Sequence, residues 1–325
     1  MTSLEYPGTG AVRTTGWSSA RSEQTAPKVP QPDLSVVVPS VNGWSDLKGC
    51  LQALAAQSGG ITIEVVVADR VGETVRAALR KNYPHVRLLT ASPESSIPSL
   101  RALAFREARA EIVGVIEDHV IVLPDWAQRM LAAHHEGALV VGGGVDNIAR
   151  ERLVDWAAFL CEYSHCLAPP AGPAHWLSGN NVTYRRSLLE RFRDAVDQER
   201  WEDHLHDTMR RAGVTLESRP DIRVGHKKHY TLREYVCQRY LYARSYAGMK
   251  LAKAGQIQKF AYGLSTLALP PILFYRTVWR VLKARRHKRE LIRSLPLLVL
   301  FVTAWAFGEA VGYWRGPGNT LAKVR

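Results

Sequence analysis

The sequence predicts an α/β fold with a doubly wound, mostly parallel sheet, followed by hydrophobic helices at the C-terminal end. Between residues 34 and 126, short apolar runs rich in β-branched residues alternate with segments of helical periodicity. This alternation is typical of a parallel sheet covered by helices on both faces. Two long apolar stretches follow much later, at 260–282 and 295–314, and their length indicates contact with a membrane.

The predicted strands and helices follow one another in order. Leu34 to Val38 form a short apolar strand, and a helix at 45–57 follows it behind Ser45, which we expect to be its cap. Gly142 to Gly144 come after an apolar run and favour a bend in a strand over a phosphate-binding loop. The other elements of the first half are strands at 61–68, 86–89 and 112–116, and helices at 72–82, 99–110 and 126–135.

Composition divides the chain into three regions. Residues 1–32 are rich in Ser, Thr, Gly and Pro and lack an apolar h-region, so we expect them to be disordered and the next domain to stay in the cytoplasm. The chain has 43 Lys and Arg against 30 Asp and Glu, a net charge of +13, with a basic run at 283–293. Such a run beside apolar segments favours anionic lipid over nucleic acid as a partner. We therefore expect a main domain at 33–250 and a membrane-associated tail at 251–325.

Polar side chains follow three of the predicted strands. Glu117, Asp118 and His119 come after the fourth strand, Asp69 follows the second, and Pro39 to Asn42 follow the first. Because ligands of open α/β sheets bind at the carboxyl ends of the strands, these residues predict a site for a divalent cation and a bound phosphate. The alternative is a polar strand end before a helix cap, which leaves three consecutive charged residues unexplained. Neither a dinucleotide-binding GxGxxG motif nor a P-loop follows the first strand.

Five segments carry a more specific signal, and they are VVVPSVN (36–42), VVVADR (65–70), PSLRALAFREARAEIVGVIEDHVIVLPDW (98–126), LSGNNVTYRRSLLE (177–190) and WEDHLHDTMRRAG (201–213). Their content and order resemble the inverting family-2 glycosyltransferases of the GT-A fold, in a membrane-associated, bacterial form. The resemblance spans residues 33–250. It implies a nucleotide-diphosphate sugar as donor and a divalent metal, Mn²⁺ or Mg²⁺, as cofactor.

The resemblance also implies which residues bind the donor. The positions concerned are Pro39, Asn42 and Asp69 beside the nucleoside, Arg101 near the diphosphate, and Asn180 and Asn181 at the sugar hydroxyls. The GNN stretch at 179–181 precedes an apparent helix, and its alternative interpretation is an ordinary turn. The alternative for Arg101 is a solvated arginine on a helix face.

The sequence departs from the family at its metal motif. Glu117-Asp118-His119 stands where the family has D-x-D. Replacing a carboxylate by an imidazole moves the preference of a site from Mg²⁺ toward Mn²⁺ or another ion that accepts nitrogen ligands. The resemblance implies Asp118 and His119 as metal ligands, Glu117 as a substrate contact, and His226, after the strand at 222–224, as a further ligand. A basic surface cluster is the competing interpretation of His226.

Glu202 and Asp203 open a helix that ends at Gly213. Inverting transfer needs one base, because the acceptor hydroxyl must lose its proton as it attacks the anomeric carbon opposite the departing diphosphate. The resemblance assigns this role to Asp203 and contact with the acceptor to Glu202. The alternative is that both acids are there to stabilise the first turn of the helix.

The two apolar segments of the tail differ in character. The segment at 295–314 is twenty residues long, enough to span a membrane as a helix, and it contains Glu309. The segment at 260–282 is interrupted by Pro270-Pro271 and carries two arginines. If both spanned, the basic run would face away from the cytoplasm, so we expect the first to be re-entrant or interfacial.

The leading functional hypothesis is a metal-dependent inverting glycosyltransferase at the cell membrane, with its catalytic domain in the cytoplasm and a lipid-linked or membrane-proximal acceptor. The Q-x-x-R-W signature of processive synthases is absent, so we expect one sugar to be transferred per encounter. A non-catalytic, membrane-tethered module that binds nucleotide sugars is an alternative, prompted by the altered metal motif. A nucleotidyltransferase is a further alternative, although its glycine-rich loop is not seen.

Overall fold

A nine-stranded mixed sheet forms the centre of the structure, a computed structural model that describes residues 31–252 and 254–325. The strand order is β3-β2-β1-β4-β8-β6-β9-β5, with β7 paired to β9. Residues 32–325 form one compact unit. The segment predicted to be disordered, 1–32, lies outside the described residues except at its last two positions, and the boundary predicted at residue 250 stays a prediction.

The parallel half of the sheet matches the predicted alternation. Its strands are β1 (Leu34–Ser40), β2 (Ile63–Asp69), β3 (Arg87–Thr90) and β4 (Ile112–Val115). Val36 and Val38 of β1 pack into one hydrophobic cluster and Val37 packs into another. Because successive side chains of a strand point to opposite faces, this division shows that both faces of the sheet are buried.

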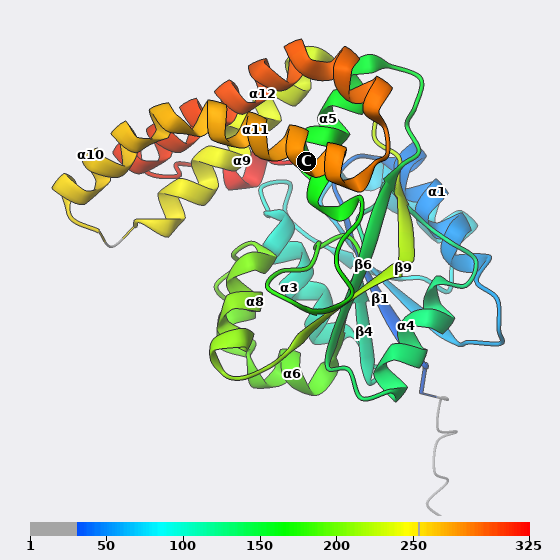
Figure 1. The fold of residues 1–325 in the computed structure, drawn as a ribbon. Coiled ribbons are helices and arrows are strands. Elements are labelled where there is room, and N and C mark those ends of the chain that lie inside the picture. Colours follow the sequence, from blue (N-terminus) through cyan, green and yellow to red (C-terminus); the bar gives the residue numbers. More distant parts are fainter. Residues whose placement is uncertain (1–30, 253) are drawn as a thin grey trace, which may run out of the picture. The chain divides into compact units, whose positions relative to one another are not determined.

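Helices cover the two faces. One layer contains α1 (Trp44–Ala55), α2 (Glu73–Asn82), α4 (Trp126–His135) and α5 (Leu153–Tyr163), and the other contains α3 (Ile97–Glu107), α6 (Arg186–Arg191), α7 (Arg193–Val196) and α8 (Glu202–Arg211). Figure 1 shows α3, α6 and α8 on the side of the sheet opposite to α1 and α4. The prediction that Ser45 caps α1 is wrong. The helix begins one residue earlier, at Trp44, with Gly43 as its N-cap.

The antiparallel half is built from segments that are distant in sequence. Its strands are β5 (Val120–Val122), β6 (Val140–Asn147), β7 (Gly172–Ala174), β8 (Val182–Arg185) and β9 (Leu216–His226). The residues after the GNN stretch form β8 first and a helix only afterwards, which corrects the expectation of a helix directly after it. The register between β6 and β9 shifts between Gly143 and Gly144. The predicted strand bend is therefore confirmed, and a Cβ at Gly143 would lie only 1.8 Å from the carbonyl oxygen of Ile222.

Four helices follow the sheet and lie together along one side of the molecule (Figure 1). They are α9 (Leu232–Lys250), α10 (Gln256–Ser265), α11 (Leu269–Ala284) and α12 (Lys288–Arg315). A capping box of Thr231 and Glu234 starts α9. Gly308 and Gly312 let α12 approach α9 closely, because a Cβ at either would come within 2.6 Å of a carbonyl oxygen of α9. Within the described part of the chain, α12 alone has the length and apolar composition needed to cross a membrane.

Candidate active site

The candidate site lies at the carboxyl edge of β4, where the chain turns into β5. Glu117, Asp118 and His119 form this turn, and the amide of Val120 closes it by donating to the carbonyl of Glu117 at 3.0 Å. β5 then pairs with β9 in a register that sets Val120 opposite His226. This pairing brings an imidazole from 107 residues along the chain next to His119.

Asp118 is buried and has protein partners on both carboxylate oxygens. Its Oδ2 accepts the amides of Val41 and Asn42, each at 2.8 Å, and its Oδ1 accepts Nδ2 of Asn42 at 2.6 Å. The same Oδ1 lies 3.2 Å from Nδ1 of His119. Burial alone would raise the pKa of Asp118, but these hydrogen bonds outweigh it and lower that pKa. Asp118 therefore fixes the end of β1 and orients the ring of His119.

Glu117, His119 and His226 bring three potential ligand atoms together. Nε2 of His119 lies 3.0 Å from Nε2 of His226 and 3.3 Å from Oε2 of Glu117. Burial, followed by the charge of His119, lowers the pKa of His226 well below its usual value. Burial opposes charge on His119 too, but its bonds to Asp118 and Glu117 raise its pKa to about 9. Because its pKa is so low, the ring of His226 is neutral, and one of its nitrogens has a lone pair that can bind a metal ion.

The structure brings two of the three predicted metal ligands together and directs the third elsewhere. His119 and His226 belong to the cluster, whereas both oxygens of Asp118 are occupied by donors from the protein. Glu117, predicted as a substrate contact, offers its carboxylate to the cluster instead. Glu117 and His119 are the first and third positions of the D-x-D spacing. A set of one oxygen and two nitrogens suits Mn²⁺ better than Mg²⁺.

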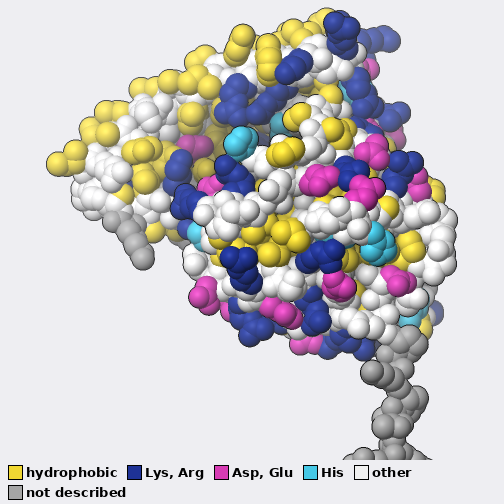
Figure 2. Space-filling model, turned by 60° about the horizontal axis from the view of Figure 1, so that its bottom comes forward, with side chains coloured by type: hydrophobic (Ala, Val, Ile, Leu, Met, Phe, Trp, Pro, Cys, Tyr) yellow, Lys and Arg dark blue, Asp and Glu magenta, His cyan; other side chains and the backbone are white. Residues whose placement is uncertain are grey.

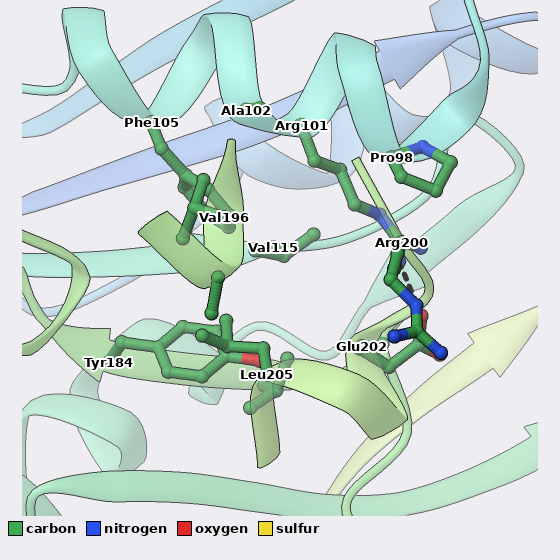
Figure 3. Close-up of a pocket in the computed structure, with 13 residues that line it drawn as sticks. Pro98, Arg101, Ala102, Phe105, Val115, Tyr184, Val196, Arg200, Glu202 and Leu205 are labelled. Atoms are coloured by element: carbon green, nitrogen blue, oxygen red, sulfur yellow. Dashed lines mark hydrogen bonds and ion pairs between the residues drawn. The ribbon is translucent and has the colours of Figure 1, made fainter. Parts of the chain in front are cut away.

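Arg101 on α3 connects this cluster to the first turn of α8. Its guanidinium donates to Oε2 of Glu202 at 2.7 Å and to Oε1 of Glu117 at 3.3 Å. Figure 3 shows its side chain running from α3 toward Glu202. The side chain is only 7% exposed, which excludes a solvated arginine on a helix face. A Cβ at Gly179 would lie 2.5 Å from the carboxylate of Glu202, so a larger residue there would displace this ion pair.

Asp203 has a different environment from its neighbour Glu202. It lines an open cavity of about 890 Å³ between the sheet domain and helices α9 to α12. Burial, and then the neighbouring charge of Glu202, raises the pKa of Asp203 to about 6. Its carboxylate is thus ionised at neutral pH and is a stronger base than that of an ordinary aspartate.

The two asparagines of the GNN stretch are not equivalent. The amide of Asn181 is fully used inside the protein, since Nδ2 donates to the carbonyls of Gly144 and Ile222 at 3.0 Å and Oδ1 accepts from Trp126 at 2.9 Å. Asn180 lines a cavity of about 190 Å³ that also touches Glu117 and Glu202. Its Oδ1 accepts from Ser178 at 2.7 Å, while its Nδ2 has no partner among the described residues. Only Asn180 has a group free to bond a sugar hydroxyl.

The three residues predicted to border the nucleoside also differ. Pro39 lines a small cavity of about 40 Å³ together with Asp118. Asn42 is engaged by Asp118 and by the ammonium of Lys228. The carboxylate of Asp69 is completely buried, pairs with Arg76 at 2.8 Å and accepts the amides of the following turn. Asp69 therefore shapes the turn after β2, and Pro39 alone of the three faces the cavity.

The end of the chain lies against this edge of the sheet. Arg70 donates to the carbonyl of Ala322 at 2.8 Å and to that of Val324. The amide of Arg325 donates to Oε1 of Gln238 on α9 at 2.9 Å. Val324 and Arg325 complete the wall of the cavity beside Pro39.

Comparisons with known proteins find one matching family model and several solved structures of similar fold. No curated protein sequence matches the chain. The crystal structure of TarS 1–349 from S. aureus is similar, with a TM-score of 0.47 and 15% identity over 86% of this chain and 90% of that one. The mannosyltransferase PcManGT from Pyrobaculum calidifontis, solved with GDP-Man and Mn²⁺, has a TM-score of 0.47 and 18% identity over 90% and 86%. The model of glycosyl transferase family 2 matches residues 35–193.

Residues 35–193, just under half of the chain, match the model of a family-2 glycosyltransferase domain. The protein is thus a glycosyltransferase, and its α/β architecture is the GT-A fold that the sequence predicted. The matched stretch extends from β1 to the start of α7 and contains Arg101, Glu117 and His119. It ends before Asp203 and His226, whose places in the site come from the geometry described above.

The candidate site also contains residues that the sequence analysis missed. Glu162 lines all three of its cavities and pairs with Arg239 of α9 at 3.1 Å. Burial raises the pKa of Glu162 above its usual value, although Arg239 opposes this. The available signal was an acid in the otherwise apolar stretch 156–163, because a carboxylate on a buried face needs a partner or a function.

Replacing Arg101 by Met tests whether its bridge supports the site. The substitution leaves Glu117 and Glu202 without their cation, and we expect the free energy of unfolding to fall by about 3–5 kcal/mol. The control is Arg106→Met on the same helix, whose exposed pair with Asp197 is expected to contribute less than about 1 kcal/mol. Urea unfolding of both variants measures the difference. Equal losses of stability in the two variants would show that the bridge of Arg101 contributes no more than an exposed ion pair.

Proposed function

We propose that this protein is an inverting glycosyltransferase that moves a single sugar from a nucleotide-diphosphate sugar to a lipid-linked or membrane-proximal acceptor, with Asp203 as general base. The observation that carries the proposal is the contrast between two adjacent acids. Glu202 is held by Arg101 beside the donor side of the site, whereas Asp203 lines the large cavity under the C-terminal helices. A base that lines this cavity can accept the proton of an acceptor that enters from the side of the C-terminal helices.

The transfer is a single displacement at the anomeric carbon. Asp203 accepts the proton of the acceptor hydroxyl as its oxygen forms a bond to that carbon. The bond from the carbon to the diphosphate oxygen breaks on the opposite face, and the nucleoside diphosphate leaves with the electron pair. Asn180 has a free amide group for a sugar hydroxyl in the cavity that Glu117 and Glu202 also line. Arg101 supplies positive charge at the same place.

The residues at the turn after β4 fit a divalent metal. Glu117, His119 and His226 would hold the ion, and Asp118 would orient His119 from behind, as carboxylates commonly do for metal-bound histidines. A bound divalent cation would neutralise charge on the diphosphate of the donor. The donor set favours Mn²⁺.

The outer surface of the C-terminal helices fits a lipid bilayer. Large apolar side chains are strongly exposed along it, among them Ile257, Leu267, Tyr275, Ile292 and Phe307. Figure 2 shows hydrophobic side chains gathered along this edge, with Lys and Arg side chains beside them. A surface of this kind is rare on soluble monomers and is typical of helices that lie in a membrane interface.

The basic run stays on the side of the catalytic domain. Arg286 forms an ion pair with Asp146 of β6 at 2.9 Å and donates to the carbonyl of Leu167. Two full membrane crossings by the flanking segments would carry residue 286 away from β6. We therefore infer that the helices hold the domain against the inner face of the membrane, where anionic headgroups attract the run.

Replacing Asp203 by Asn tests the base. The amide cannot accept the proton, so kcat is expected to fall by about 10²–10⁴-fold. In the unmodified enzyme, kcat/KM should decrease as pH falls below about 6, because protonation of Asp203 removes the base. Asp207→Asn, one turn further along α8, is the matched control and should keep its activity. Full activity of Asp203→Asn would refute the assignment.

Binding of Mn²⁺, measured by electron paramagnetic resonance, tests the ligand set. Glu117→Gln removes the carboxylate from the cluster and is expected to abolish tight binding. Asp118→Asn alters only the support of His119, so a loss of about 10–100-fold is expected. Glu190→Gln, at an exposed glutamate of α6 outside the cluster, should bind as the unmodified protein does. The reverse ranking of the first two variants would make Asp118 the ligand.

Labelling of an introduced cysteine tests the placement on the membrane. Arg289→Cys, in a protein whose exposed Cys237 is replaced by Ser, places a thiol in the basic run. In intact cells an impermeant maleimide should not reach it, and after permeabilisation it should react fully. Labelling from outside would mean that the segments cross the membrane.

A further inference from the structure

The cavity that Asp203 lines has features that the transfer reaction alone does not use. Its walls come from the loop before β8, from α8 and from all four C-terminal helices. It has a volume of about 890 Å³ and is open to the outside. That size is in the range of sites for organic ligands, which commonly occupy about 300–1,000 Å³.

Two arginines in this cavity lack an anionic partner. Arg276 and Arg280 lie one turn apart on α11, where side chains share a face, and neither forms an ion pair within residues 31–252 and 254–325. Arg280 is half-buried, and burial, followed by the charge of Arg276, lowers its pKa. The third arginine of the cavity, Arg239, is different because it already pairs with Glu162. Two like charges held together without compensation indicate a place for an anion.

The wall near these arginines adds a polar group. His165 lines the cavity, and burial with the charges of Arg280 and Arg276 lowers its pKa to about 3, so its ring is neutral. Its buried Nε2 has no hydrogen-bond partner among the described residues. Burying such a polar atom is unfavourable unless a ligand or a water molecule forms a hydrogen bond with it.

Much of the rest of the cavity wall is apolar, and Lys250, Ser265 and Glu309 add polar groups to it. Leu269 and Leu273 of α11 and Val302 of α12 line it, together with the rings of Tyr246 and Tyr262. The same helices expose their other apolar side chains toward the proposed membrane surface. A hydrocarbon chain could therefore lie against apolar side chains of α11 and α12 both in the bilayer and in the cavity.

We propose that this cavity binds the acceptor as a phosphate-bearing lipid, with its phosphoester on Arg276 and Arg280, its chain on the apolar helices and its hydroxyl at Asp203. This assignment rests on the proposed function and narrows the acceptor to one chemical class. Arginine suits the phosphate because its planar guanidinium donates two parallel hydrogen bonds to it. The proton and bond changes are those of the displacement described above.

Calorimetry on the full chain in a non-ionic detergent tests the assignment, with dihexanoyl phosphatidylglycerol below its micellar concentration as the probe. Arg276→Gln/Arg280→Gln should weaken binding by about tenfold or more, because two charge-assisted contacts are lost. The matched control is Arg193→Gln/Arg233→Gln, which removes two exposed charges outside the cavity and should bind the probe as the unmodified protein does. The double variant Arg276→Lys/Arg280→Lys keeps both charges but lacks the planar guanidinium, so its affinity for the probe should lie between those of the other two variants.

Inorganic phosphate serves as the second probe and separates a lipid from a free phosphate. The lipid should bind at least about tenfold more tightly, because burial of its chain adds to binding. Equal binding of the two probes, or equal binding of the lipid by the double Gln variant and its control, would overturn the proposal. If the double variant does not fold, Arg276→Gln alone, at an exposed position, provides the comparison.

Hydrolysis of nucleotide sugars by the unmodified protein distinguishes this proposal from the proposed function. Lipid binding that depends on Arg276 and Arg280, in a protein that cleaves no donor, would retain the site and reject the transfer reaction. Donor cleavage with lipid binding that ignores both arginines would retain the enzyme and reject the site.

Discussion

The site depends on one buried cation that is shared between two acids. Glu117 and Glu202 come from opposite halves of the sheet domain, and each would be costly to bury alone. Arg101 lies between them and offers a hydrogen bond to both. Since α3 is packed on β1 and β2, the parallel half of the sheet fixes the position of that cation. The first turn of α8, and with it Asp203, is then held at a defined distance from the turn after β4.

The arrangement also separates the tasks of neighbouring acids. Glu202 is ion-paired, whereas Asp203 is partly desolvated beside a like charge and has a raised pKa. A similar division exists at the turn after β4, where Asp118 has donors on both oxygens and Glu117 faces the histidines. In both cases adjacent carboxylates are chemically distinct because their surroundings differ. One member of each pair builds the site and the other is left available for chemistry.

Local patterns in the sequence were sufficient for the parallel half of the fold. The alternation of β-branched runs with helical spacing predicts β1 to β4 and the helices between them, because each such element is defined by neighbouring residues. The pairing of β5 with β9 joins segments about a hundred residues apart, and no local pattern encodes that register. His226 was predicted through the family resemblance, but its contact with His119 depends on this pairing.

The same limit explains which site residues were assigned incompletely. Asp118 was predicted as a ligand because it is the one aspartate kept in the motif, yet the amides at the end of β1 use its oxygens. Asn181 and Asn180 look alike in sequence, and only the folded structure shows that Asn181 donates to the carbonyls of Gly144 and Ile222. Arg239 and Glu162 become part of the site only when α9 packs against α5. Whether a polar side chain already has its hydrogen-bond partners within the protein depends on the fold and cannot be predicted from composition.

The position of the final residues has a practical consequence for handling the protein. Val324 and Arg325 form part of the wall beside Pro39, and Arg70 and Gln238 hold that stretch from two sides. An affinity tag or fluorescent partner fused after Arg325 would therefore begin at the rim of this cavity, where added bulk competes for the same space.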